Sequence, residues 1–161
     1  MASSEQFQPQ LPTSAIENQP TEKPEVWFEY VVRVYPHHID YGGIVWHGVY
    51  LSWMEEARVE SLRSIGIEFA DLVNLGCDLP VVDLSIKYHQ PIKLGMVVVV
   101  KTCMRNTQGV RLEWDYKIQS LDNQELYTTA KVTLVTIDRE KGKIMRRLPP
   151  SIEAIFTRLS K

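Results

Sequence analysis

Residues 38–50 read HIDYGGIVWHGVY and run directly into LSWMEEAR at residues 51–58. The carboxylate of Asp40 precedes a pair of glycines and a short apolar run, and a helical pattern follows at once. This order predicts a carboxylate beside the N-terminal end of a buried helix, where free backbone N–H groups and the helix dipole favour negative charge. A base or nucleophile next to such an anion site is the arrangement that acyl transfer requires.

The helical pattern begins at about His47 and ends at about Gly66, since glycine is a natural helix stop. Mostly apolar residues recur at the spacing of one helix face: Tyr50, Trp53, Met54, Ala57, Ser61 and Ile65. Charged residues occupy the other sides, among them Glu55 and Glu56. We therefore predict a long helix whose aromatic face packs in the core, in preference to a helix that holds a cofactor.

The remainder of the chain is patterned mainly as β-strands. Alternating or continuous apolar residues predict strands over 27–35, 81–88, 97–106, 111–118 and 126–137, with short helices over 68–75 and 152–159. Strands joined by tight turns form antiparallel sheets, and a long apolar helix has to bury itself against one face of the sheet. The predicted fold class is α+β, with one antiparallel sheet wrapped around one long central helix.

The composition excludes several classes of protein. A chain of 161 residues, 44% of them hydrophobic, is long enough for one core and too short for two comfortable domains. A net charge of −2 argues against general nucleic-acid binding. Cys77 and Cys103 form no CxxC pair, which favours buried thiols in a reducing compartment over a disulfide or a zinc site. No apolar run approaches the roughly 18 residues of a membrane span.

The first 24 residues are rich in Ser, Gln, Pro, Thr and Glu. They have neither the apolar core of a secretory signal nor the arginines of a transit peptide, so we expect a disordered tail over residues 1–24. A single domain is expected over residues 25–161, and the protein is expected to be cytoplasmic.

The chain resembles the hotdog-fold thioesterases, in particular the family of 4-hydroxybenzoyl-CoA thioesterase and of the acyl-CoA thioesterases associated with the Tol–Pal system. The likeness covers roughly residues 27–148. It rests on Asp40, the Gly43–Trp46 run, Tyr50, Glu56–Arg58, and the strand and turn from Ile86 through Pro91 to Gly95. This resemblance implies a hotdog fold and hydrolysis of an aromatic or fatty acyl-CoA, with coenzyme A as part of the substrate and no separate cofactor or metal. It also implies homodimers or homotetramers with active sites at subunit boundaries.

The resemblance implies roles for individual residues. In the family, the aspartate at the position of Asp40 is the catalytic carboxylate and acts as nucleophile or through a water. The backbone N–H at the start of the long helix, which matches His47, holds the thioester carbonyl oxygen. Trp46, Tyr50 and Trp53 are candidates to line the acyl pocket, or simply to pack. Many relatives carry an acid and a threonine before the aspartate, where this chain has a histidine and an isoleucine.

Several alternatives remain open from the sequence. Asp40 is also a typical turn or N-cap residue, and a second branch of hotdog thioesterases takes its carboxylate from the long helix, where Glu55 or Glu56 would serve. An acyl carrier protein thioester is an alternative substrate, and a non-catalytic acyl-thioester-binding protein is an alternative function. A hotdog hydratase fits poorly, since its Asp-x4-His motif does not match the spacing of Asp40 and His47. Coenzyme A phosphates need cations, for which the candidates are Lys87, Lys93, Lys101, Arg105, Arg146 and Arg147.

Overall fold

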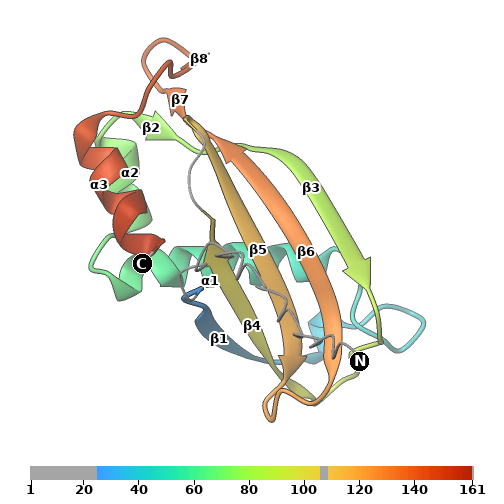
Figure 1. Ribbon diagram of the computed structural model, residues 1–161. Helices are drawn as coiled ribbons and strands as arrows, with labels where there is room; N and C mark the ends of the chain where they lie inside the picture. Colours follow the sequence, from blue (N-terminus) through green and yellow to red (C-terminus); the bar gives the residue numbers. More distant parts are fainter. Residues whose placement is uncertain (1–24, 106–108, 161) are drawn as a thin grey trace, which may run out of the picture.

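Figure 1 shows a computed structural model of the protein, which describes residues 25–105 and 109–160. Five strands form one antiparallel sheet in the order β1–β4–β5–β6–β3. Their bounds are Phe28–Arg33 for β1, Val97–Met104 for β4, Arg111–Ser120 for β5, Leu126–Val135 for β6 and Val81–Tyr88 for β3. The long helix α1 (Val49–Ser64) lies across one face of the sheet. The predicted α+β hotdog architecture is confirmed.

The sheet forms because side chains along its central strands alternate between the core and the solvent. In β5, Leu112, Trp114, Tyr116 and Ile118 are buried, and the residues between them are exposed or half-buried. Successive side chains of a strand point to opposite faces, so the buried set faces α1 and the charged set forms the outer face. Edge strand β3 differs, because its residues are exposed except for half-buried Ile86.

Helix α1 buries the face that the sequence predicts, with Trp53, Met54 and Ala57 almost completely covered. The helix begins at Val49, two residues later than predicted, because the Val49 N–H bonds to the Trp46 carbonyl oxygen (2.9 Å) in a turn. A partly buried polar contact joins helix and sheet, since Arg58 Nη1 donates to the Tyr116 hydroxyl over 2.9 Å.

A second sheet has no counterpart in the predicted elements. It consists of β2 (Cys77–Asp78), β7 (Ile137–Asp138) and β8 (Lys143–Ile144), in the order β2–β7–β8. The strand predicted to reach residue 137 ends at Val135, because Thr136 bonds to the Val110 carbonyl oxygen and the chain then pairs with β2. Three short helical segments complete the fold: η1 (Pro36–His38), α2 (Phe69–Asn74) and α3 (Pro150–Leu159).

Both cysteines are free and buried, as expected. Burial raises the pKa of the Cys77 thiol to about 11, so this thiol is unreactive at neutral pH. None of the helices in the described ranges is long and apolar enough to cross a membrane. The tail expected over residues 1–24 lies outside the described residues.

Candidate active site

The loop between β1 and α1 holds Asp40 in a closed turn. The Gly42 N–H donates to Asp40 Oδ1 over 2.8 Å, and the Ile44 N–H makes a longer contact of 3.5 Å with the same oxygen. The backbone of Asp40 bonds to Ile44 and Gly43 across the same turn. Gly43 has a φ of +80°, which glycine adopts without strain. The glycine pair therefore fixes the carboxylate through one oxygen, and Oδ2 bonds to no group among the described residues.

The start of α1 provides free backbone donors beside this turn. Within residues 25–105 and 109–160, the N–H groups of His47 and Gly48 have no hydrogen-bond acceptor. The first N–H groups of a helix have no partner inside the helix, and the helix dipole places partial positive charge there. This end of α1 can therefore stabilise an oxyanion.

One open cavity of about 320 Å³ joins the carboxylate and the helix start. Asp40 and His47 line it from the loop, Tyr50 lines it from α1, and Tyr88 and His89 line it from the end of β3. The rings of Tyr50 and Tyr88 meet edge to face, with centroids 5.0 Å apart. The cavity thus combines one carboxylate and an anion-stabilising helix end with an aromatic wall.

The tyrosines of this wall are neutral at physiological pH. Burial raises the pKa of Tyr50, and the nearby hydroxyl of Tyr88 and carboxylate of Asp40 raise it further. Burial also raises the pKa of Tyr88. Neither phenol can therefore act as a base, which leaves the Asp40 carboxylate and the imidazoles of His47 and His89 as the candidates among the described residues of the cavity.

The structure brings together three of the five predicted site residues. Asp40, His47 and Tyr50 line the cavity, whereas Trp46 and Trp53 do not. Trp53 is only 1% exposed and packs in the core. Trp46 is 50% exposed, and its ring lies so close to Gly48 that a Cβ on this glycine would be 2.3 Å from a ring carbon. Trp46 therefore shapes the helix start from outside the cavity.

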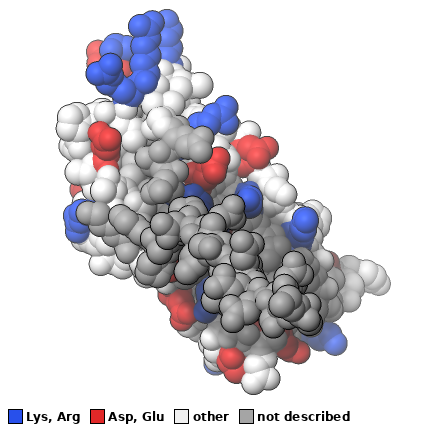
Figure 2. All heavy atoms as spheres, in the orientation of Figure 1, with Lys and Arg blue, Asp and Glu red and all other residues white. Residues whose placement is uncertain are grey.

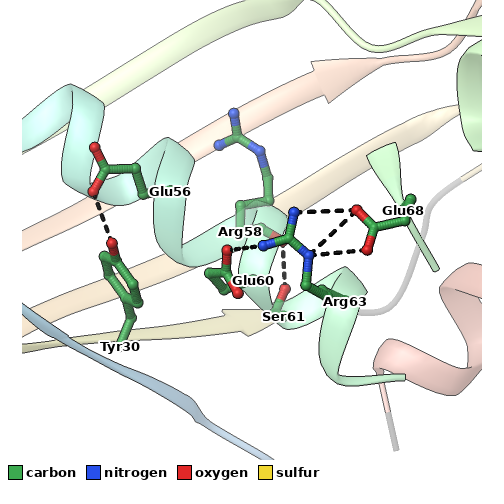
Figure 3. A network of polar contacts seen from close by, with 7 residues as sticks. All are labelled: Tyr30, Glu56, Arg58, Glu60, Ser61, Arg63 and Glu68. Carbon is green, nitrogen blue, oxygen red and sulfur yellow. Dashed lines mark hydrogen bonds and ion pairs between the residues drawn. The ribbon is translucent and has the colours of Figure 1, made fainter. Parts of the chain in front are cut away.

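The helix glutamates lie away from this cavity. Glu55 and Glu56 line a different depression on the exposed side of α1. As Figure 3 shows, Glu56 accepts a hydrogen bond from the Tyr30 hydroxyl (3.1 Å), and Arg63 further along α1 binds both Glu60 and Glu68. The geometry favours Asp40 over either helix glutamate.

His38 of the loop and His89, which follows β3, have structural partners. His38 accepts a hydrogen bond from the Tyr35 N–H at Nδ1 (3.1 Å) and packs its ring against Trp53. Burial lowers the pKa of His38, so this ring is neutral at physiological pH. His89 Nε2 lies 2.8 Å from Thr129 Oγ1. In the part of the chain that the structure describes, no group of three His, Cys, Asp or Glu side chains is placed to hold a metal ion.

Tyr88 and His89 are among the cavity residues that were not predicted as site residues from the sequence. Tyr88 ends β3 and its hydroxyl donates to the His47 carbonyl oxygen over 2.9 Å; His89 follows it. The contact between Tyr88 and His47 spans 41 residues. A local pattern cannot encode it, although Tyr88 belongs to the strand and turn that carry the family resemblance.

Fold and cavity together define a hotdog-fold protein in which a carboxylate and the N-terminal end of the long helix share one cavity. A family model described as the thioesterase superfamily matches residues 42–127. A Synechocystis sp. protein whose name places it among the esterases is 59% identical over 135 residues, which are 84% of this chain and 81% of that protein. The acyl-CoA thioester hydrolase YbgC of Escherichia coli O6:H1 is 32% identical over 129 residues, which are 80% of this chain and 95% of that protein.

A solved structure agrees with these relatives. The DHNA-CoA thioesterase from Staphylococcus aureus superposes with a TM-score of 0.74 at 27% identity, and the match covers 82% of this chain and 89% of that one. The chain belongs to the thioesterase superfamily. It is therefore an enzyme, a thioester hydrolase.

Proposed function

We propose that the protein hydrolyses an acyl-CoA thioester, with Asp40 as nucleophile or general base and the backbone N–H of His47 as oxyanion donor. The observation that carries this proposal is the shared cavity, which holds a fixed carboxylate and a helix-start donor that has no acceptor among the described residues. The names of the E. coli and S. aureus relatives, both CoA thioesterases, support the same substrate class.

The mechanism follows from these two groups. Asp40 attacks the thioester carbonyl carbon through Oδ2, or takes a proton from a water that attacks it. As the new C–O bond forms, the carbonyl oxygen gains negative charge and accepts a hydrogen bond from the His47 N–H. The C–S bond then breaks, and the thiolate of coenzyme A leaves and takes up a proton. If Asp40 is the nucleophile, water hydrolyses the resulting anhydride and restores the carboxylate.

The acyl group proposed for this site is aromatic or aliphatic. Ile44, Val45, Tyr50 and Tyr88 give the cavity apolar walls, and such walls accept an aryl ring and a hydrocarbon chain alike. The same cavity would accept an acyl chain on acyl carrier protein, which remains the alternative substrate.

We further propose that the active unit is a homodimer joined at β3. In the described part of the chain this strand pairs with β6 on one side only. Val81, Val82, Leu84 and Tyr88 are 39–50% exposed on it. An exposed apolar edge strand is a template for a second strand, and a two-fold axis would place two identical edges together. Because Tyr88 and His89 line the cavity at the end of β3, such a dimer would place each cavity next to the subunit boundary.

Two further expectations belong to this proposal. Hydrolysis by a carboxylate and a backbone donor needs no cofactor beyond the coenzyme A of the substrate. A cytoplasmic location accords with Cys77 and Cys103, which are both free.

The test of this function is thiol release from a panel of aromatic, short, medium and long acyl-CoA thioesters, followed with a chromogenic disulfide. We expect turnover of at least one acyl class. Saturable binding of acyl-CoA without thiol release would contradict hydrolysis and identify a binding protein. Release only from acyl carrier protein thioesters would identify the alternative carrier.

A further inference from the structure

The outer face of the sheet, on the side away from α1, carries lysines on neighbouring strands. Lys117 of β5 lies opposite Thr129 of β6, which in turn lies opposite Lys87 of β3. Lys131, two residues further along β6, is diagonal to both. Directly opposed side chains start about 5 Å apart and diagonal ones about 7–8 Å apart. Lys87, Lys117 and Lys131, which we call the outer lysine cluster, therefore surround Thr129.

Figure 2 views the molecule from this side, and blue Lys and Arg side chains are visible along the sheet. Like charges in neighbouring sheet positions are destabilising. Among the nearby carboxylates, Asp115 lies directly opposite Lys131, and Asp83 and Glu113 lie diagonal to it. Asp115 and Glu25 are both bound by Arg105, and Glu29 is bound by Lys101 (2.8 Å). No ion pair within the described ranges joins the outer lysine cluster to a carboxylate. The three ammonium groups of the cluster therefore remain available to an anionic ligand.

The outer lysine cluster lines a hollow of about 320 Å³. Among the described residues, four cationic and two anionic side chains surround this hollow, and together they carry a net charge of +2. Lys117 Nζ lies 4.7 Å from the centroid of the Trp27 ring, and such a cation–π contact restrains the ammonium group. Ser85 and Thr129 add hydroxyl groups to the same wall. The hollow thus offers several hydrogen-bond donors of positive charge around an open space.

This hollow adjoins the catalytic cavity. Thr129 Oγ1 in the hollow lies 2.8 Å from His89 Nε2, and His89 lines the cavity that contains Asp40. Lys87 in the hollow and Tyr88 in the cavity are consecutive residues on the two faces of β3. A ligand bound on the outer face therefore lies beside the rim of the active site.

We propose that the outer lysine cluster binds a phosphate-bearing ligand. Phosphate oxygens accept hydrogen bonds from ammonium and hydroxyl groups, and charge-assisted bonds of this kind are the stronger ones. Three ammonium groups around one point suit a ligand with more than one phosphate charge. Two sources share this chemistry. One is the nucleotide end of the acyl-CoA substrate, which rests on the proposed function; the other is a free nucleotide, which does not.

The primary test is calorimetric titration of the purified full-length chain with adenosine 3′,5′-bisphosphate. We expect saturable binding by the wild type and a loss of affinity of roughly tenfold or more in the Lys117→Gln/Lys131→Gln double variant. The matched control is Lys143→Gln, which removes an exposed lysine on β8, outside the hollow. This control variant should bind the bisphosphate as the wild type does. Thermal unfolding of each variant verifies that the fold is intact.

Kinetics then separate the two sources. If the ligand is the substrate's nucleotide end, the bisphosphate competes with acyl-CoA, and the double variant raises KM for acyl-CoA but not for the matching acyl-pantetheine. If the ligand is a free nucleotide, the bisphosphate binds without competing, and the KM values of the double variant stay unchanged. Either result supports the phosphate site.

Absence of bisphosphate binding by the wild type would overturn the proposal. Equal affinity of the wild type and the folded double variant would overturn it as well, since the phosphate would then bind elsewhere. Failure of the proposed function looks different: the wild type would release no thiol from any acyl-CoA, while the calorimetric result would stand unaffected.

Discussion

The side-chain hydroxyl of Tyr88 donates a hydrogen bond of 2.9 Å to the backbone carbonyl oxygen of His47. This bond joins the exposed edge strand β3 to the residue whose N–H we propose as the oxyanion donor. A planar peptide group links the held carbonyl to the N–H of Gly48. Tyr88 therefore acts as a positioning residue, which restrains the backbone at the start of α1.

Replacing Tyr88 with phenylalanine tests this role. Tyr88→Phe keeps the ring that packs against Tyr50 and removes only the hydroxyl. We expect kcat to fall about three- to tenfold, the range that one neutral hydrogen bond supports, with little change in KM. Tyr30→Phe is the matched control, because its hydroxyl bonds to Glu56 outside the cavity. A Tyr88→Phe enzyme with wild-type kcat would contradict the positioning role.

We predict that glycine is required at position 48 because the Trp46 ring lies close to it, and not because of its backbone conformation. Its φ of −74° and ψ of −23° are open to any residue, but a Cβ would lie 2.3 Å from the Trp46 ring. Gly48→Ala should therefore shift the helix start and lower kcat by about tenfold or more, as overpacking of this kind costs ~1–3 kcal/mol.

The control for Gly48→Ala is a double-mutant cycle with Trp46→Ala. Once the ring is removed, the alanine at position 48 fits, so the double variant should have nearly the kcat of Trp46→Ala alone. If Gly48→Ala lowers kcat by the same factor in the wild type and in Trp46→Ala, the steric explanation is wrong.

If the protein is a dimer joined at β3, a charge introduced on this strand should dissociate it. Leu84→Lys places a charge on the exposed edge strand, where a two-fold axis would bring it close to its own copy. We expect this variant to run as a monomer in size-exclusion chromatography with light scattering and to lose most of its activity. Leu121→Lys changes a leucine outside the sheet that is more exposed than Leu84, 56% against 39%, and should remain dimeric. A wild-type monomer with full activity would refute the dimer.

Stability at high pH should depend on Tyr127. Burial, with a contribution from its 2.7 Å hydrogen bond to Glu125, raises the pKa of Tyr127 to about 12. Because the folded-state pKa lies above the unfolded value of 10.0, the stabilisation is complete below pH 10 and is lost as the pH rises toward 12. The free energy of unfolding in urea should fall less steeply over this window in Tyr127→Phe than in the wild type. Identical slopes would show that Tyr127 titrates normally.

The long helix and the long strands can be predicted from the sequence because their apolar residues recur at a clear spacing over many positions. The alternation of Leu112, Trp114 and Tyr116 and the helical spacing from Tyr50 leave little choice of period, and the structure confirms both. The sheet of β2, β7 and β8 could not be predicted, since two-residue strands carry no period. The residues of the candidate site also differ in how far the sequence predicts them. Asp40 and His47 are local to one motif, whereas the bond from Tyr88 depends on strand pairing far along the chain.

The most direct test of Asp40 as the catalytic carboxylate is thiol release by Asp40→Asn on the best acyl-CoA substrate. The asparagine side-chain oxygen can still accept the Gly42 N–H bond, so the turn stays intact while the negative charge is lost. We predict a fall in kcat of at least about a hundredfold, with wild-type rates in Glu55→Gln and Glu56→Gln. Full activity in Asp40→Asn, or loss of activity in either glutamine variant instead, would contradict the account and move the catalytic carboxylate onto α1.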